Sequence, residues 1–419
     1  MSEKVTDKPK NGVEKETVIT SATSKETGVV DEVERVIERG EAQTISLENI
    51  EKGLTVLWQA AAKPRDGEEE QPVMRACVFN LVICVNGDDE LSEVTDTIAE
   101  LTWSYPCRAI VLVRKPEVPE SSTNALISAH CQLPTSTGKK VCCEQITVIG
   151  TGAAADGLWS LVLPLLVPDL PVLLYWPKEL MLEGELFQHL MDTVDRLIVD
   201  SRNFDDPSAT FAHLAELSKT QFVETALGDL NWSRLAAWRN LLADFFDDAH
   251  FLPYLSQVDS VELHYEAPDD NNNPNFSEAL LLVGWLGNLL NWQPAFNLQR
   301  RGSNATLILN QRGAPLTITL HGHNDRVDEL GGITQVQIKA SKPGDTEGES
   351  HSATFSIQLS DDYDHAMTSV EEDGKVLMKR NVMFPRPSIT DLLSQDLALI
   401  RRDQYFQSAL ELAGEFSRQ

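Results

Sequence analysis

The chain has 419 residues, of which 42% are hydrophobic and 24% charged, and its formal net charge is −29 at pH 7. Its length allows two or three domains with hydrophobic cores. The negative charge disfavours nucleic acid and anionic membranes as partners. We expect a cytoplasmic protein, because the sequence shows no apolar run long enough for a membrane span and no secretory signal, and six cysteines are too few for a disulfide-stapled secreted fold.

Residues 1–45 contain no aromatic residue and are rich in Glu, Lys, Thr and Val. Such a composition buries too little apolar surface to offset the entropy of ordering, so we expect a disordered acidic tail. We expect order to begin at Ser46, whose hydroxyl can cap a helix with apolar residues at helical spacing, namely Ile50, Leu54, Leu57 and Ala61.

Residues 46–205 predict an α/β domain with a mainly parallel sheet. Apolar runs without clean alternation indicate buried strands at residues 76–85, 107–114, 142–150, 171–176 and 196–200. Helical patterns separate most of them, at residues 88–105, 157–166 and 185–195. Strands that alternate with helices are typical of a doubly wound sheet that is covered on both faces.

Residues 206–419 predict an α+β domain with helices and an antiparallel sheet. Helical patterns lie at residues 230–246 and 277–292, and their tryptophans are expected in the core: Trp232, Trp238, Trp285 and Trp292. A strand is expected between them at 260–267. Short alternating segments follow at residues 305–310, 315–321, 334–340, 353–359 and 375–380. Ser388 and Asp391 resemble a capping box that begins a last helix through Ile400.

The stretch AHCQLPTSTGKKVCCEQITV, residues 129–148, combines cysteines, a histidine and lysines. Adjacent side chains in a strand point to opposite faces, so His130–Cys131 and Cys142–Cys143 each offer about one ligand, and the spacing fits zinc poorly. Gly138–Lys139 lacks the rest of the phosphate-loop pattern. Neither site is therefore predicted here.

The stretch GTGAAA at residues 150–155 has the outline of a dinucleotide-binding turn after a strand. The next strand, however, ends in Trp176–Pro177 and not in an acid placed for a ribose. An ordinary strand-to-helix turn, in which glycine is common, is the favoured interpretation. The alternative left open is a nucleotide- or sugar-phosphate-binding α/β enzyme that uses the sheet edge near Gly150 and Gly152.

No catalytic constellation emerges from the sequence, which lacks a G-x-S-x-G nucleophile motif and a cysteine-protease signature. His321 and His323 in HGHND could be same-face metal ligands, but a solvated strand end is the favoured interpretation. The residues therefore single out no catalytic group, no metal site and no cofactor site.

Cys142 and Cys143 are the redox candidates, because two preceding lysines favour the thiolate. The competing interpretation is that they are small buried hydrophobes, as expected for Cys77, Cys84 and Cys107. No cysteine follows Cys143, so any thiol switch must lie in the α/β domain.

From about Ser46 to its end, the sequence resembles the glucose-6-phosphate dehydrogenase assembly protein OpcA family. The resemblance is carried by ISAHCQLPTSTGKKVCCEQITV, YPCRAIVLV, LVLPLLVPDLPVLLYW and DRLIVDS in the first domain, and by LNWSRLAAWRNLLADFFD and EALLLVGWLGNLLNW in the second. The acidic, cysteine-containing form is most similar to cyanobacterial members. The blocks are long, which makes chance agreement improbable.

The resemblance implies a non-catalytic partner that assembles and allosterically activates the glucose-6-phosphate dehydrogenase oligomer of the oxidative pentose phosphate pathway. In cyanobacteria it also implies a link between activation and thioredoxin-controlled redox state. A pure folding chaperone is a third hypothesis. Exposed aromatic and arginine residues are common interface anchors, and the candidates for partner binding are Arg108, Lys139, Lys140, Trp176, Arg202, Arg401 and Arg402.

Overall fold

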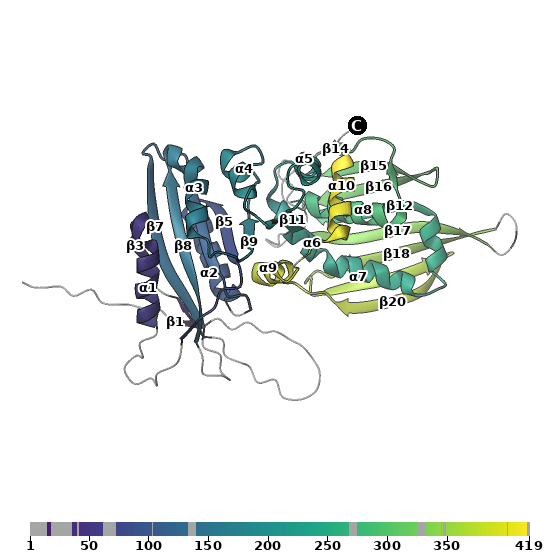
Figure 1. Cartoon of the computed structure of the whole chain (residues 1–419). Helices are drawn as coiled ribbons and strands as arrows, with labels where there is room; N and C mark the ends of the chain where they lie inside the picture. Colours follow the sequence, from purple (N-terminus) through teal and green to yellow (C-terminus); the bar gives the residue numbers. More distant parts are fainter. Residues whose placement is uncertain are drawn as a thin grey trace, which may run out of the picture. The chain divides into compact units, whose positions relative to one another are not determined.

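The computed structural model describes residues 15–17, 36–39, 42–61, 73–102, 104–132, 140–267, 275–324, 332–344, 346, 349–399 and 401–416. Within these ranges, no helix is both long and apolar enough to cross a membrane. The chain divides into two compact units. Unit 1 extends to Tyr175 and includes Leu182–Asp195, whereas unit 2 comprises Trp176–Met181 and the chain from Arg196 onward (Figure 1).

Unit 1 is built on a mixed, mostly parallel sheet. Its centre has the strand order β8-β6-β5-β9, all parallel, with the bounds β5 (Asn80–Asn86), β6 (Arg108–Lys115), β8 (Lys140–Thr151) and β9 (Val172–Trp176). On the β8 side, β7 (Ser122–Gln132) is antiparallel and β4 (Val73–Arg75) is parallel. The strands β5, β6 and β9 are buried almost throughout, as their unbroken apolar runs predict.

Three short strands precede the first helix, namely β1 (Lys15–Thr17), β2 (Val36–Arg39) and β3 (Gln43–Ile45). Both β2 and β3 pair with β7, and β1 pairs with β2. The backbone hydrogen bonds of these three segments are made with neighbouring strands, and the disordered tail over residues 1–45 stays a prediction. The remaining residues of this stretch, except Ala42, lie outside those described.

The helices of unit 1 are α1 (Ile50–Ala61), α2 (Gly87–Leu101), α3 (Trp159–Val162) and α4 (Glu185–Met191), with 3₁₀ turns η1 (Leu47–Asn49), η2 (Gly152–Leu158) and η3 (Leu163–Leu165). α1 packs on β7, and α2 packs on β5 and β6. The helix predicted at 157–166 is thus broken into short turns, in which Pro164 interrupts helical hydrogen bonding.

Unit 2 begins with two parallel strands, β10 (Arg196–Val199) and β11 (Ala226–Asp229), joined through η4 (Ser201–Asn203) and α5 (Pro207–Thr220). The predicted domain boundary at 205/206 therefore lies after the observed change of unit at Arg196. The reason is that β10 is tied to the C-terminal helices: Arg196 forms a buried ion pair with Asp396.

A nine-stranded sheet forms the main layer of unit 2, in the order β13-β15-β16-β12-β17-β18-β19-β20 with β14 paired to β15. Its strands are β12 (Val258–Glu266), β13 (Gln293–Pro294), β14 (Gln299–Arg301), β15 (Asn304–Gln311), β16 (Ala314–His323), β17 (Ile333–Pro343), β18 (Ser350–Leu359), β19 (His365–Glu372) and β20 (Lys375–Met383). All pairings are antiparallel except that between β12 and β16. The prediction of an antiparallel C-terminal sheet is confirmed in its main feature.

The helices of unit 2 are α6 (Leu230–Arg234), α7 (Ala236–Asp244), α8 (Phe276–Leu290), α9 (Ile389–Leu397) and α10 (Gln404–Glu415), with turns η5 (Phe245–Asp247) and η6 (Leu252–Ser256). Helix α8 lies between the sheet and α10 (Figure 1), which explains its apolar surface on nearly all sides. Gly284 permits this packing, because a Cβ there would overlap the backbone carbonyl of Ala409.

The predicted core tryptophans of unit 2 are mostly confirmed, since Trp232, Trp238 and Trp292 are buried, whereas Trp285 is half-buried. Ser388 and Asp391 form the predicted capping box at the start of α9. That helix ends at Leu397 and does not continue through residue 400, and the last helix is the separate α10.

Candidate functional site

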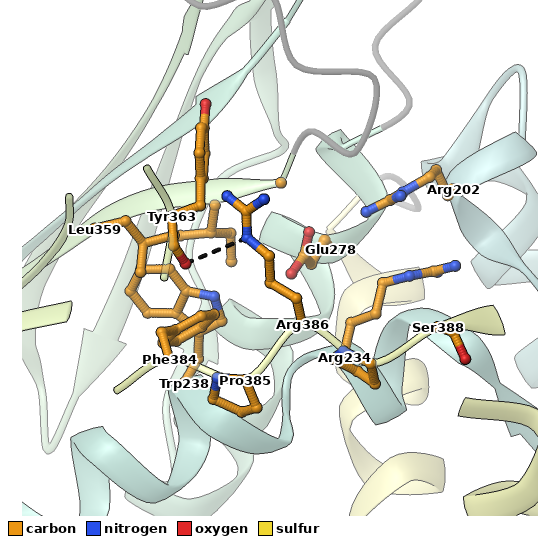
Figure 2. Close-up of a pocket in the computed structure, with 13 residues that line it drawn as sticks. Arg202, Arg234, Trp238, Glu278, Leu359, Tyr363, Phe384, Pro385, Arg386 and Ser388 are labelled. Carbon is orange, nitrogen blue, oxygen red and sulfur yellow. Dashed lines mark hydrogen bonds between the residues drawn. The ribbon is translucent and has the colours of Figure 1, made fainter. Parts of the chain in front are cut away.

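A pocket of about 260 Å³ opens in unit 2 (Figure 2). Its walls come from the turn after β10, from helices α6, α7 and α8, from the start of β17, and from the segments that follow β18 and β20. The polar side chains that line it are Arg202, Arg234, Glu278, Arg386 and Ser388. The aromatic ones are Trp238, Tyr363 and Phe384. Three arginines in one pocket stand out in a chain whose charge is −29.

Two aspartates at the ends of parallel strands position the first two arginines. Asp200 follows β10 and Asp229 ends β11, so both lie at the carboxyl edge of this strand pair. Asp200 caps η4 by accepting the backbone N–H of Arg202 at 3.3 Å, and Asp229 caps α6 by accepting that of Asn231 at 2.9 Å. These caps fix the turns that carry Arg202 and Arg234.

Arg234 is held by a two-point ion pair with Asp200. Its Nη1 and Nη2 donate to the two carboxylate oxygens at 2.7 and 2.9 Å, and Nη1 also donates to Asn231 Oδ1 at 2.8 Å. Burial raises the pKa of Asp200, but the charge and hydrogen bonds of Arg234 outweigh this effect, and the pKa lies below its usual value. Arg234 is therefore rigid and its charge is largely neutralised.

Glu278 lies among the three arginines in Figure 2, and its side chain is almost fully buried. Burial raises the pKa of Glu278, an effect that Arg202 and Arg234 partly offset. Its Oε2 accepts no hydrogen bond from the described residues. For Arg202 the shift is in the opposite direction: burial and the positive charge of the nearby Arg234 lower its pKa. A backbone hydrogen bond from Ile333 also lowers the pKa of Glu278, so this buried carboxyl group is stabilised from within the fold.

Arg386 forms the more open side of the pocket. Its Nε donates to the carbonyl of Tyr363 at 3.3 Å, the bond drawn in Figure 2, and Nη2 donates to the carbonyl of Asp362 at 2.9 Å. The guanidinium carbon also lies 4.6 Å from the centre of the Tyr363 ring. Its side chain is 31% exposed, compared with 12% for Arg234. Arg386 can therefore reach a group that enters from solvent.

The pocket combines guanidinium donors with aromatic walls. Guanidinium groups bind carboxylate and phosphate through paired, charge-assisted hydrogen bonds. Aromatic and arginine side chains around a pocket are also typical of the residues that anchor protein partners. The arrangement therefore suits an anionic group, presented either by a small molecule or by an acidic side chain of another protein.

Of the residues proposed from the sequence as partner anchors, only Arg202 lies in this pocket. Arg108 is buried; its Nε lies 2.5 Å from Glu144 Oε1, and its Nη1 lies 2.8 Å from Glu51 Oε1. Trp176 is buried as well, and its indole N–H donates to the carbonyl of Glu179 at 3.0 Å. Both predictions of exposed anchors are wrong, because partners inside the fold satisfy the polar groups of these side chains.

The other predicted anchors are distributed differently. Arg401 is exposed and Arg402 is half-buried, and both lie in the turn before α10 and not on a helix. Lys139 and the side chain of Lys140 lie outside the described part of the chain. Arg401 and Arg402 therefore remain candidates that the geometry does not bring to the pocket.

Cys142 is disulfide-bonded to Cys131, its partner across β7 and β8, and both are buried. Cys143 is the next residue along β8, so its side chain points to the opposite face of the sheet. It is a buried free thiol whose Sγ accepts the backbone N–H of Cys107 at 3.0 Å. A hydrogen bond with the Cys107 thiol lowers the pKa of Cys143, although burial opposes it. The two redox candidates thus have different chemistry.

The turn at Gly150 and Gly152 follows β8 and enters the 3₁₀ turn η2. The order of the parallel strands reverses between β5 and β9, so a dinucleotide would meet the turn after β5. Helix α2 begins there with Asp88, Asp89 and Glu90 in its first turn, and this charge repels a phosphate. The ordinary turn is therefore the better interpretation of Gly150–Ala155.

Sequence reasoning missed Arg234, Glu278 and Arg386, because the segments that carry them lie far apart in the chain. A signal for Glu278 was present: it is an acid in the first turn of a helix that is otherwise apolar. Such a buried acid needs compensating groups nearby.

Two family models match the chain, and both describe a glucose-6-phosphate dehydrogenase subunit. The model of its N-terminal domain matches residues 99–216, and the model of its C-terminal domain matches residues 225–410. The chain belongs to the OpcA glucose-6-phosphate dehydrogenase assembly family. The C-terminal match includes all the lining residues of the pocket except Arg202.

Curated cyanobacterial relatives agree with this assignment. The chain is 35% identical over 208 residues to a Synechocystis protein whose name marks it as a candidate OxPP cycle protein OpcA, a match that covers 49% of this chain and 41% of the relative. A Nostoc punctiforme protein with the same name is 35% identical over 196 residues, or 46% of this chain and 40% of the relative. The matched part is thus less than half of each relative.

The solved structures to which this chain shows similarity are distant from it. An inositol dehydrogenase homologue complexed with NAD⁺ from Azotobacter vinelandii is 9% identical with a TM-score of 0.42, covering 82% of this chain and 86% of that one. The apo scyllo-inositol dehydrogenase from Lactobacillus casei is 8% identical with a TM-score of 0.38, and the match covers 82% of this chain and 96% of that one.

Proposed function

We propose that this chain is a non-catalytic assembly factor and allosteric activator of glucose-6-phosphate dehydrogenase in the oxidative pentose phosphate pathway. The observation that carries the proposal is the match of residues 99–216 and 225–410 to the N- and C-terminal domain models of the assembly family. The described residues of unit 2 also provide an arginine-lined pocket that can receive a group of the partner.

The pocket is proposed as a contact point for the dehydrogenase oligomer. Its aromatic and arginine lining is typical of an interface anchor, and the more open guanidinium of Arg386 suits an acidic side chain of the partner. The negative charge on the rest of this chain would then attract a basic surface of the dehydrogenase and orient it for binding.

The test uses the purified chain and purified dehydrogenase from the same organism. Analytical ultracentrifugation should show a complex heavier than the dehydrogenase alone, and dehydrogenase activity should rise as the chain is titrated in. The chain alone should not reduce NADP with glucose 6-phosphate. Turnover by the chain alone would instead support the alternative, a sugar-phosphate-binding enzyme, and the absence of any complex would exclude the assembly role.

Redox control through thioredoxin is part of the proposal, and the Cys131–Cys142 disulfide is the element that could carry it. Reduction by a dithiol would open the bond to two thiols, with two electrons and two protons supplied by the reductant, which itself becomes a disulfide. Because both cysteines are buried, the ends of β7 and β8 must separate before the reductant reaches a sulfur.

A further inference from the structure

Two adjacent parallel strands of unit 2 bring a glutamate and three histidines together. Burial alternates along β12, where Leu263 is buried and Glu262 and His264 are half-buried. Tyr265 contacts Phe276 of helix α8, so Glu262 and His264 lie on the face away from that helix. The register places His321 of β16 opposite His264. The group thus shares one accessible face of the sheet.

The ligand atoms of three of these residues converge. His264 Nε2 lies 3.1 Å from Glu262 Oε1, and His321 Nε2 lies 3.7 Å from the same oxygen. One ligand atom from each residue lies within 4.8 Å of the other two. In a tetrahedral zinc site, metal–ligand distances of 2.0–2.2 Å place the ligand atoms about 3.3 Å apart. The observed spacing therefore needs only side-chain adjustment to hold such an ion.

His323 supports this arrangement from behind. Its Nε2 lies 2.6 Å from Nδ1 of His264, and the two rings are stacked 4.8 Å apart. Without a metal, His264 Nε2–H donates to Glu262 Oε1 at 3.1 Å, because a carboxylate only accepts, and Nδ1 accepts from His323 Nε2–H. When a metal ion replaces the Nε2 proton, His264 can donate Nδ1–H to His323 instead. Metal-ligating histidines are commonly oriented by a hydrogen bond from the other ring nitrogen. His323 can therefore hold the tautomer of His264 that a bound metal requires.

We propose that Glu262, His264 and His321 form a divalent transition-metal site that takes Zn²⁺, with His323 as the orienting residue. Two imidazoles and a carboxylate suit zinc, and three protein ligands leave a fourth position for water or a partner group. The site is independent of the arginine pocket and of the proposed role in assembly. It revises the interpretation of His321 and His323 as an ordinary solvated strand end.

The experiment uses the untagged full chain, stripped with EDTA and dialysed. Titration calorimetry with Zn²⁺, and visible absorption with Co²⁺ as a spectroscopic probe, should show one site with nitrogen and oxygen ligands. The variants His264→Ala and His321→Ala should lose that site, and His323→Ala should weaken it about 10- to 100-fold without abolishing it. His351→Ala is the matched control, because His351 lies on the same sheet but pairs with Asp373.

The cobalt spectrum also separates this site from the cysteines of unit 1, since thiolate ligands add charge-transfer bands. Loss of the site in both strand variants, with retention in His351→Ala and unchanged circular dichroism, supports the proposal. Equal Zn²⁺ affinity and stoichiometry in wild type, His264→Ala and His321→Ala would overturn it. Failure of the wild-type chain to bind Zn²⁺ or Co²⁺ would overturn it as well.

Discussion

Arg196 and Asp396 form a buried ion pair between positions 200 residues apart in the sequence, with Nε and Oδ1 2.7 Å apart. Both side chains are almost fully buried, at 4% and 2% exposure. A Cβ at Gly228 would overlap the Asp396 carboxylate, so β11 leaves room for the pair. The contact fixes α9 against the strand pair that leads into the arginine pocket.

Replacing Arg196 with Met should therefore destabilise unit 2 strongly. Removing one member of a buried ion pair leaves the other charge uncompensated, which costs about 3–5 kcal/mol. Denaturant unfolding of the full chain measures the loss. Lys219→Met is the matched control, because Lys219 and Glu411 form an exposed pair that should contribute less than about 1 kcal/mol. Equal losses in the two variants would contradict the assignment of Arg196.

Asp229 should make stability depend on pH. Burial raises its pKa to about 7, whereas an unfolded chain releases this proton near about pH 4. The folded state therefore binds more protons between these values, and the unfolding free energy falls as pH rises through that window. Asp229→Asn keeps the oxygen that accepts the backbone N–H groups of Ser201 and Asn231, and it removes the titration.

Unfolding experiments at pH 6 and pH 8 test this prediction. The wild type should lose about 1 kcal/mol more than Asp229→Asn between the two pH values. Other titrating groups act equally in both proteins and cancel in the comparison. Identical losses would show that Asp229 has an ordinary pKa in the folded chain.

The two redox candidates should behave differently on substitution. In Cys142→Ser the disulfide with Cys131 cannot form, so activation of the dehydrogenase should no longer differ between oxidised and reduced chain. Cys143→Ser keeps the disulfide and should retain the difference. Activity assays after treatment with reduced or oxidised thioredoxin measure both. A redox response that survives in Cys142→Ser and vanishes in Cys143→Ser would place the switch at Cys143.

Arg386 should contribute to partner binding more than an arginine outside the pocket. Arg386→Gln removes the guanidinium that is most open to an entering group, and we expect the affinity for the dehydrogenase to fall at least about 10-fold, as for an interface anchor. Arg380→Gln, an exposed residue of β20, is the control. Biolayer interferometry compares the two, and equal affinities would exclude the pocket as a contact point.

Local patterns in the sequence predict the strands and helices well, but they do not predict the site. The apolar runs of β5, β6 and β9 and the capping box at Ser388 follow from short-range rules. Strand β7 was not predicted. The pairing of Cys131 with Cys142 depends on the register between β7 and β8, and no sequence pattern at residues 116–141 specifies this register. The main error concerned which side chains are exposed to solvent. Arg108 and Trp176 lie at strand ends in the sequence, but both side chains are buried and hydrogen-bonded within the fold.

The pocket is a product of tertiary structure. Arg202, Glu278 and Arg386 come from three separate segments, and the two arginines look like ordinary surface charges when their own segments are considered alone. Only the tertiary structure shows that Arg202 and Arg234 lie close enough to Glu278 to offset part of the effect of its burial.

The central claim is that this chain shifts the dehydrogenase toward a form that binds substrate better. A partner can do this only by its differential affinity for the two forms, and the coupling is reciprocal, typically about 5- to 150-fold. The most direct measurement is titration calorimetry of the chain into the dehydrogenase, with and without saturating glucose 6-phosphate. We predict a lower Kd in the presence of the sugar phosphate, matched by an equal increase in the affinity of the complex for glucose 6-phosphate. An identical Kd in both conditions would contradict the allosteric claim.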